Sequence, residues 1–330
     1  MKSFDVVALG ELLIDFTEAG LSEQGNPLWE ANPGGAPCNV LAMLQKLGRS
    51  TAFIGKVGND VYGHQLRAVA EQAGIDTSAL LNDPEVHTTL AVVHRLPNGD
   101  RDFSFYRNPG ADMMLREDEL PRDLTASTRI FHFGTLSMTH PGVKNATKTA
   151  VLRAKQAGAL ISFDPNLRPP LWSSLEDARK QIEWGLGQCD ILKISDNELE
   201  FLLPDAVGAH SVRQPDYAAG AQALLAKYPN IKLLNVTCGP DGAWCFCCGC
   251  SVFVPAFTLG GTIETTGAGD TFCACVLDNV LENGVENRST DSLRAMLRFA
   301  NAAAYLVTTK KGAIRSMPDP EQIEQILALA

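Results

Sequence analysis

The sequence predicts an α/β fold in which helices flank a mostly parallel central sheet. Three observations support this prediction. Short apolar runs alternate with helical patterns almost from end to end. Several of these runs lack polar alternation, as is typical of parallel strands covered on both faces. No repeat, low-complexity segment or linker interrupts the 330 residues, so we expect a single domain over residues 1–330.

The predicted strands are short and mostly apolar; they comprise residues 4–9, 51–57, 129–133, 159–163, 191–194 and 232–236. Helices are expected between them. One apolar helix face, with members at i, i+3, i+4 and i+7, is formed by Val40, Met43, Leu44 and Leu47. Gly48 is the expected end of that helix. Residues 61–74 and 143–158 show the same pattern.

Two strand-rich regions interrupt this alternation. Residues 11–32 contain strand-like pieces without a helical pattern, and residues 88–107 contain two strand-like runs around Pro97-Asn98-Gly99-Asp100. Asn-Gly between two such runs favours a hairpin. We expect these insertions to form a small projecting sheet. Such a sheet could act as a lid that excludes water from a reaction, and surface decoration is the alternative.

The charge balance excludes some partners. Lys and Arg total 28 against 38 Asp and Glu, which gives a net charge of −10. Nucleic acids and anionic membranes need clustered basic residues, so neither is expected as a partner, although a small basic pocket for one phosphorylated ligand is compatible with this balance.

No apolar run is long enough to span a bilayer and no signal-peptide pattern opens the chain, which predicts a cytoplasmic protein. Nine cysteines, mostly within apolar segments, indicate reduced core thiols.

The most informative segment is residues 264–272, which lead directly into a helical pattern. Gly267, Ala268 and Gly269 leave their backbone N–H groups unobstructed at a helix start, where an oxyanion or a transferring phosphoryl group can bind. Asp270 follows in the first turn and could accept a proton from an attacking hydroxyl. The alternative is an ordinary helix N-terminus with an acidic residue.

A second glycine-rich segment is residues 33–39. Gly34 and Gly35 permit close approach of a ligand to the backbone, and Asn39 offers a donor and an acceptor to sugar hydroxyls. The alternative is a tight turn that enters a helix at Pro37. Other phosphate-binding patterns are absent from the sequence: it has no P-loop, no protein-kinase motifs and no complete dinucleotide fingerprint.

Four segments in order resemble those of the ribokinase-type (PfkB) carbohydrate kinases; they are residues 34–39, 53–58, 164–168 and 265–270. The resemblance covers essentially the whole chain. Residues 105–115 are most similar to the bacterial and plant fructokinase branch. The resemblance implies a ribokinase-like fold and transfer of the γ-phosphoryl group of ATP, with Mg²⁺, to the 6-hydroxyl of D-fructose. Alternatives are a kinase for 2-keto-3-deoxygluconate or another sugar, and a kinase-like protein that binds without catalysis.

Roles for individual residues follow from this resemblance. Asp270 would be the catalytic base, and Gly267, Ala268 and Gly269 would form the anion hole for the γ-phosphoryl group. The positions that match sugar or phosphate contacts are Asp15, Gly34, Gly35, Asn39, Arg107 and Arg168. On residue type alone, Asp15 could instead be a solvated strand residue and Arg168 a member of a surface ion pair.

Nucleotide and metal contacts are also implied by the resemblance. The positions matching ATP contacts are Lys193, Ser195, Thr237, Gly239, Gly242 and Asn301. Glu198 would organise Mg²⁺ through water, although Ser195 stands where the family has Asn. Residues that match a K⁺ site are Glu264, Thr266, Gly312, Ala313 and Ser316. Glu264 replaces the usual Asp, so K⁺ dependence is left open.

Two further expectations concern thiols and assembly. Cys245-Phe246-Cys247-Cys248-Gly249-Cys250 has two interleaved C-x-x-C spacings and is predicted to be a hairpin with Gly249 at its turn. Structural thiols are favoured there over zinc ligands or redox-active thiols, because no second pair stands nearby in sequence.

Projecting β lids in the resembled family often pair between subunits, so we expect a homodimer formed through the lid.

Overall fold

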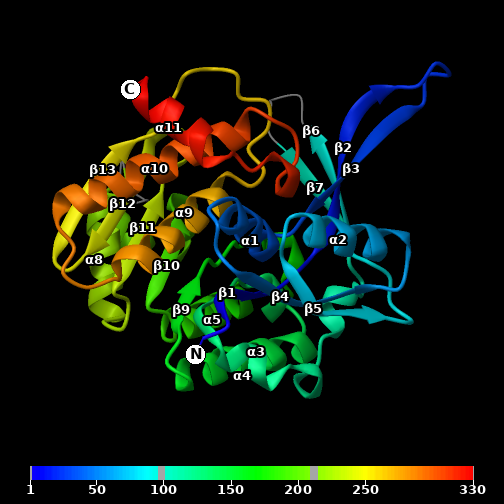
Figure 1. The fold of residues 1–330 in the computed structure, drawn as a ribbon, viewed down its shortest axis with the longest axis horizontal. Helices are drawn as coiled ribbons and strands as arrows, with labels where there is room; N and C mark the ends of the chain where they lie inside the picture. The colour runs from blue at the N-terminus through cyan, green and yellow to red at the C-terminus, as the bar shows by residue number, and fades with distance from the viewer. Residues whose placement is uncertain (1, 96–100, 209–214, 330) are drawn as a thin grey trace.

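The computed structural model describes residues 2–95, 101–208 and 215–329 (Figure 1). Among these residues, one sheet has the strand order β13-β12-β11-β10-β9-β8-β1-β4-β5. Its strands are β1 (Phe4–Leu9), β4 (Thr51–Gly58), β5 (Asp76–Asp83), β8 (Thr128–Phe133), β9 (Leu160–Phe163), β10 (Ile191–Ser195), β11 (Leu233–Thr237), β12 (Gly242–Cys247) and β13 (Cys250–Pro255). The pairs from β5 to β11 are parallel, and β12 and β13 extend the sheet as an antiparallel hairpin.

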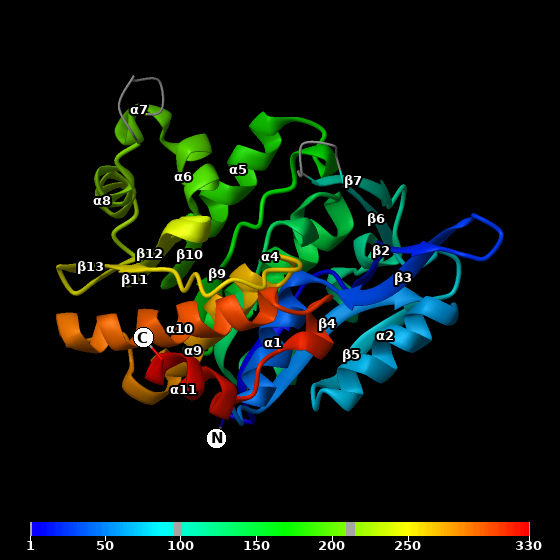
Figure 2. The same cartoon turned by 90° about the horizontal axis from the view of Figure 1, so that it is seen from above.

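Helices cover both faces of this sheet, as the edge-on view in Figure 2 shows. They are α1 (Ala36–Lys46), α2 (Val61–Gln72), α3 (Arg122–Ala126), α4 (Pro141–Gln156), α5 (Leu175–Leu186), α6 (Asp196–Leu202), α7 (Pro204–Val207), α8 (Tyr217–Lys227), α9 (Ala268–Asn283), α10 (Thr290–Thr308) and α11 (Pro320–Ala328). In β1, Val6 and Ala8 pack into one apolar cluster, with α1, α9 and α10, whereas Val7 and Leu9 pack into the other, with α4, α5 and α8. Burial on both faces explains why the strand lacks polar alternation.

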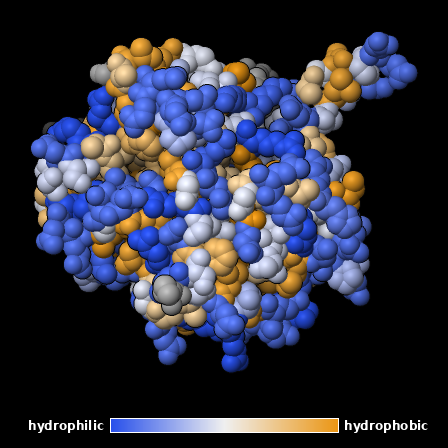
Figure 3. All heavy atoms as spheres, in the orientation of Figure 1, coloured by the Kyte–Doolittle hydropathy of each residue, from blue (hydrophilic) through white to orange (hydrophobic). Residues whose placement is uncertain are grey.

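A second sheet has the order β3-β2-β6-β7. Its strands are β2 (Leu13–Leu21), β3 (Pro27–Gly34), β6 (Leu90–Arg95) and β7 (Arg101–Tyr106). This confirms the predicted small sheet, while the proposed turn at residues 97–100 lies outside the described residues. The β2–β3 hairpin projects from the body as an arm (Figure 1). Figure 3 shows hydrophobic side chains along the arm and a hydrophilic tip.

The predicted elements agree with the structure within a residue or two at most ends. The strand at residues 4–9 is observed with these bounds, and α1 is followed by Gly48 in the left-handed region (φ 79°), as expected of a helix end. The missed strand is β5, which lies at the edge of the sheet. Its sequence, DTSALLND, is mostly polar, so it lacks the apolar run by which the other parallel strands are predicted.

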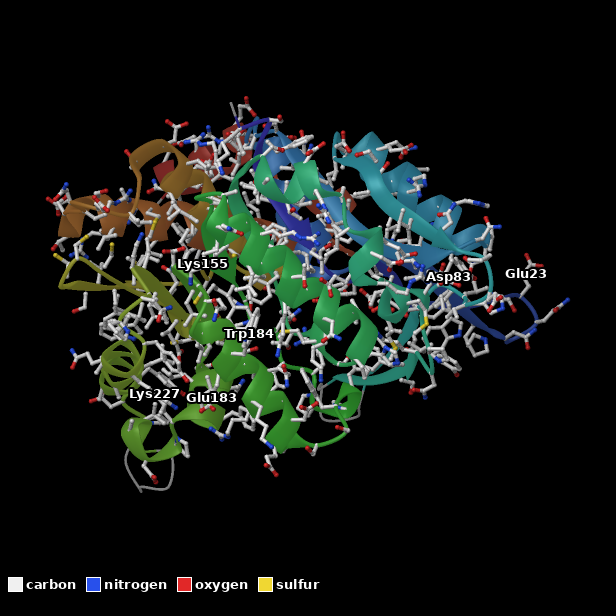
Figure 4. The ribbon with its side chains drawn as sticks, turned by 90° about the horizontal axis from the view of Figure 1, so that it is seen from below. Glu23, Asp83, Lys155, Glu183, Trp184 and Lys227 are labelled. Carbon is white, nitrogen blue, oxygen red and sulfur yellow. The ribbon has the colours of Figure 1, made fainter. Side chains whose placement is uncertain are left out.

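The face away from the lid arm is braced by surface contacts between helices. Glu183 of α5 and Lys227 of α8 lie side by side (Figure 4), with 3.0 Å between the carboxylate oxygen and Nζ. Lys148 Nζ lies 5.0 Å from the centre of the Trp184 ring. The ion pair is largely exposed and stabilises the fold only slightly, whereas Trp184 is half-buried and packs against the apolar cluster that includes α4, α5 and α8. Within the three described ranges, the helices are too short or too polar to cross a membrane.

Candidate active site

A cavity of about 380 Å³ opens where the parallel strands end and the second sheet meets the body. Its walls come from the segment after β1, the start of α1, the segments after β9 and β10, and the start of α9. This is the edge at which open α/β sheets bind ligands. The predicted site residues that it brings together are Asp15, Gly35, Asn39, Arg168, Lys193, Ser195, Glu198, Thr266, Gly267, Gly269 and Asp270.

Asp270 stands in the first turn of α9 and is held by Asn39 of α1. Asn39 Nδ2 donates to Asp270 Oδ2 at 2.7 Å. Burial raises the pKa of Asp270 to about 6, despite this hydrogen bond and the positive charges of Lys193 and Arg168. Asp270 is therefore ionised at neutral pH, yet more basic than an ordinary carboxylate, which suits a general base. Asn39 Oδ1 is buried without a hydrogen-bond partner among the described residues, so an acceptor remains for a ligand hydroxyl.

The glycines at the start of α9 lie in close contact with neighbouring groups, and a side chain at Gly267 would also strain the backbone. Gly267 adopts φ 81° as the N-cap, and a Cβ there would lie 2.9 Å from Ala313 Cβ. A Cβ on Gly269 would lie 3.1 Å from Lys193 Nζ. Ala268 N donates to Thr265 O at 3.3 Å, and Ala268 does not line the cavity. The anion-binding surface predicted for this helix start therefore depends on Gly267 and Gly269, where the helix dipole favours negative charge.

A buried ion pair lies beside the start of α9. Lys193, on β10, contacts Asp164, which follows β9, with 3.0 Å between Nζ and Oδ2. Burial alone would lower the pKa of Lys193, but Asp164, Glu198 and Asp270 outweigh that effect and raise it. Lys193 is therefore a fixed positive charge in the cavity. Asp164 was not singled out as a site residue from the sequence, although it belongs to the motif at residues 164–168.

The segment after β9 is fixed by Glu198. Glu198 Oε1 accepts from Leu167 N at 2.7 Å, and Oε2 accepts from Ser195 N at 2.8 Å within a capping box at the start of α6. Arg168, next to Leu167, lines the cavity. A carboxylate has about four acceptor positions, so Glu198 keeps capacity for a water molecule. This chemistry fits the predicted water-mediated Mg²⁺ contact, which stays a prediction.

Asp15 on β2 faces the cavity near the glycine turn. A Cβ on Gly34 would approach Asp15 Oδ2 to 2.7 Å. Gly35 has φ 135°, and a Cβ there would lie 2.4 Å from Glu11 O. Burial, with repulsion from Glu264 and Asp270, raises the pKa of Asp15 to about 7. The two glycines thus allow α1 and the lid strand to meet tightly around this carboxyl.

Glu11 is a cavity residue that sequence reasoning missed. It is 3% exposed, lines the cavity and accepts from Ala36 N at 2.9 Å through Oε1. Burial raises its pKa to about 7. The available signal was its position just after β1, since a charged residue at the carboxyl end of a buried parallel strand lies at the ligand-binding edge.

Arg107 lies outside this cavity. Its guanidinium donates to Asp112 Oδ2 at 2.6 and 2.9 Å, to Thr139 Oγ1 at 2.8 Å and to Leu136 O at 2.9 Å. It lines a separate cavity of about 190 Å³ with Phe105, which borders both cavities. In this structure Arg107 therefore anchors the base of the lid. Its contact with a substrate stays a prediction.

The predicted nucleotide residues beyond β10 also lie outside the cavity. Thr237 ends β11, and Gly239 and Gly242 form the following turn with φ 51° and 130°. Asn301 Nδ2 donates to Val254 O and Pro255 O at 3.0 and 3.1 Å, which attaches α10 to the end of β13. Their roles toward ATP stay predictions.

Glu264 links the anion-binding segment to the chain before α11. Its Oε1 accepts from Thr266 Oγ1 at 2.5 Å, and its Oε2 accepts from Gly312 N at 3.2 Å. Ser316 Oγ donates to Lys311 O. Among the residues proposed for K⁺, Glu264 is thus hydrogen-bonded to Thr266 and Gly312, and Ser316 N donates to Ala313 O at 2.9 Å. Across residues 2–95, 101–208 and 215–329, no group of three or more His, Cys, Asp and Glu side chains is arranged to hold a metal ion. The preference for structural thiols at the Cys245–Cys250 segment stays a prediction.

Comparison with known proteins is consistent with this geometry. The model of the pfkB family carbohydrate kinases matches residues 3–320. The chain is 41% identical over 315 residues, 95% of its length and 92% of the relative's, to "Probable fructokinase-2" of Arabidopsis thaliana. The crystal structure of fructokinase with bound ATP from Xylella fastidiosa superposes with a TM-score of 0.86 at 28% identity, covering 100% of this chain and 99% of that one. Fructokinase from Vibrio cholerae, in its fructose-, ADP- and calcium-bound form, gives a TM-score of 0.83 at 28% identity over 98% and 99% of the two chains.

Proposed function

Since this chain belongs to the pfkB family of carbohydrate kinases, we propose that it is an ATP-dependent fructokinase, which transfers the γ-phosphoryl group to the 6-hydroxyl of D-fructose. The observation that carries the proposal is the hydrogen bond between Asn39 and Asp270 beside the glycine-rich start of α9. It puts a basic carboxylate and a sugar-binding amide next to an anion-binding surface.

The acceptor is proposed to be a neutral sugar rather than a sugar acid. Glu11 and Asp15 both line the cavity with Asn39. Their carboxylates can accept hydrogen bonds from hydroxyl groups but would repel a substrate carboxylate. This charge favours fructose over 2-keto-3-deoxygluconate, the alternative considered from the sequence.

Each side chain then has a role in the transfer. Asp270 accepts the proton of the 6-hydroxyl as the hydroxyl oxygen bonds to the γ-phosphorus atom. The bond from that phosphorus to the β,γ-bridging oxygen breaks, and ADP leaves with its electron pair. The N–H groups at Gly267 and Gly269 stabilise the charge on the equatorial phosphoryl oxygens, while Arg168 and Lys193 add fixed positive charge. Asn39 keeps Asp270 and the sugar in the attacking geometry.

Mg²⁺ is proposed to enter with the nucleotide. Mg²⁺ usually keeps several waters and binds substrate phosphates together with one or two carboxylates, and Glu198 is a buried carboxylate that lines the cavity. When bound, the ion would neutralise charge on the phosphates. Glu198 would hold one of its waters, while the other bonds of Glu198 hold the segment that carries Arg168.

The decisive test is Asp270→Asn, measured by ADP release against a panel of sugars. We expect a roughly 1,000-fold lower kcat with fructose, because general bases contribute about 100- to 10,000-fold. Asp291→Asn, at an exposed position on α10, is the matched control and should keep normal turnover. Near-normal turnover of Asp270→Asn would show that Asp270 is not the catalytic base. Equal activity of the parent on 2-keto-3-deoxygluconate would show that the site does not prefer fructose.

We also propose a cytoplasmic homodimer that assembles through the lid. Exposed apolar residues on the second sheet support this, among them Leu21 at 69%, Leu28 at 45% and Tyr106 at 66% exposure. Pairing between subunits would cover them and the sheet edge. Sedimentation should report a dimer that Leu28→Glu weakens, whereas a monomer at high protein concentration would contradict the proposal.

A further inference from the structure

The hairpin between β12 and β13 ends in an unusual turn. Cys248 and Gly249, with φ 53° and 77°, are both in the left-handed region between the paired residues Cys247 and Cys250. Two-residue hairpin turns of this kind favour Asn-Gly or Asp-Gly, since few other residues adopt φ above zero easily. Turn formation therefore does not explain a cysteine at position 248, and such outliers point to a role for the side chain.

The two adjacent thiols are close together and share one acceptor. Cys247 Sγ and Cys248 Sγ are 3.5 Å apart, and both donate to Val285 O, at 3.3 and 3.4 Å. Val285 lies between α9 and α10. Both cysteines also border a surface cavity of about 300 Å³, lined on its other side by Leu225 and Lys232. A small reagent thus has access to a preassembled pair of sulfurs.

The pair is electrostatically asymmetric. Cys248 is exposed, and a backbone hydrogen bond from Arg288 is the main cause that lowers its pKa. Cys247 is 3% exposed, and burial raises its pKa to about 12. An exposed thiol with a lowered pKa beside a buried thiol with a raised pKa is the arrangement of an attacking and a resolving cysteine.

From this geometry we propose that Cys247 and Cys248 form a thiol modification site, at which a peroxide converts the pair to a vicinal disulfide. The Cys248 thiolate attacks a peroxide oxygen. The O–O bond breaks, hydroxide leaves with its electron pair, and the sulfur is oxidised by two electrons to a sulfenic acid. Cys247 Sγ then attacks Cys248 Sγ: the S–S bond forms, the S–O bond breaks, and the thiol proton leaves with the hydroxyl group as water.

The product is expected to be easily reduced. The sulfurs must approach from 3.5 Å to about 2.05 Å, and adjacent residues have Cα atoms closer than in ordinary disulfides. Strained disulfides of this kind are the labile ones. Oxidation also removes both S–H donors from Val285 O. The site does not share residues with the active-site cavity, so this inference is independent of the proposed function.

Peptide mapping of the full-length protein tests the proposal. The reduced protein is treated with stoichiometric hydrogen peroxide, blocked with N-ethylmaleimide and digested with chymotrypsin, which cuts after Phe246 and Phe253. We expect peptide 247–253 to lose about 2 Da and to carry one maleimide, on Cys250. Dithiothreitol should restore three labelled thiols.

Variants of the neighbouring cysteines show which thiol forms the disulfide bond with Cys248. Cys250→Ser should still form the bond, whereas Cys247→Ser, or Cys247→Ala if the serine variant folds poorly, should stop at a dimedone-reactive sulfenic acid on Cys248. In the reduced parent, iodoacetamide should label Cys248 about tenfold faster than Cys250. A bond that survives in Cys247→Ser, a bond lost in Cys250→Ser, or equal labelling rates would each overturn the assignment.

Discussion

Replacing Asp15 by asparagine should make the ligand-free protein more stable at neutral and alkaline pH. Burial, with repulsion from Glu264 and Asp270, raises the pKa of Asp15 from 3.8 to about 7. Between about pH 4 and pH 7 the folded protein therefore keeps a proton on Asp15 that the unfolded chain has lost. The contribution of Asp15 to the free energy of unfolding falls as pH rises through this window.

The size of the effect follows from the same numbers. At about 1.4 kcal/mol for each pKa unit, the ionised carboxyl costs the folded state about 4 kcal/mol above pH 7. The cavity admits water, which screens the charge, so we expect roughly half of this amount. Asp15→Asn should thus raise the free energy of unfolding by about 2 kcal/mol at pH 8 and leave it nearly unchanged near pH 4.

Equilibrium urea unfolding of both proteins from pH 4 to pH 8 provides the assay. Asp118→Asn is the control, because that side chain is 74% exposed and its ion pair with Arg116 contributes little. The curves of Asp15→Asn and the parent should diverge only as pH rises toward 7. Parallel curves across the whole range would show that Asp15 is ionised as easily in the folded protein as in the unfolded chain, and would refute the reasoning.

Three further predictions concern the neighbouring contacts. Lys193→Met leaves the Asp164 carboxylate buried without its partner and should lower the free energy of unfolding in urea by about 3 kcal/mol. The Asp164→Leu/Lys193→Met double variant should recover part of this loss. Gly269→Ala adds a methyl group 3.1 Å from Lys193 Nζ. The variant should have a kcat about 100-fold lower, with little change in ADP affinity measured by calorimetry. An unchanged kcat would show that the methyl group does not crowd the anion hole. Glu264→Asp shortens the side chain that bridges Thr266 and Gly312. KCl, but not LiCl, should then raise the melting temperature of the variant and leave that of the parent unchanged. An equal KCl response in the parent would show that Glu264 does not replace the ion.

The parts of the site that could be predicted from sequence are those written in one contiguous segment. The helix start at Gly267 to Asp270 is local, because small residues, helix periodicity and an acidic first turn all lie within a few positions. The contact of Asp270 with Asn39 joins residues 231 apart and depends on how α1 packs against α9. Local patterns contain no information about that packing.

Arg107 illustrates a second limit of sequence reasoning. An arginine suits a phosphate, a sugar or a carboxylate equally well, and its partner depends on which group lies within reach. Here Asp112 and Leu136 O are within reach, so the guanidinium is buried in the protein's own hydrogen bonds. The edge strand β5 was missed for a related reason, since its residues become a strand only through pairing with β4.

The acidic residues of the cavity connect stability to function. Glu11 and Asp15 each have a pKa raised to about 7, so burial of these carboxyls destabilises the empty site when they are ionised. Apolar replacements would stabilise the fold but could not accept hydrogen bonds from a polyhydroxyl substrate. A bound sugar supplies hydroxyl donors in addition to the Ala36 N–H that Glu11 already accepts, which favours the ionised forms and lowers both pKa values. Binding of fructose near pH 6 should therefore release protons, and the affinity of the protein for fructose should rise with pH. Calorimetry in buffers of different ionisation enthalpy measures both quantities. Binding without proton release would show that these carboxyls do not contact the sugar.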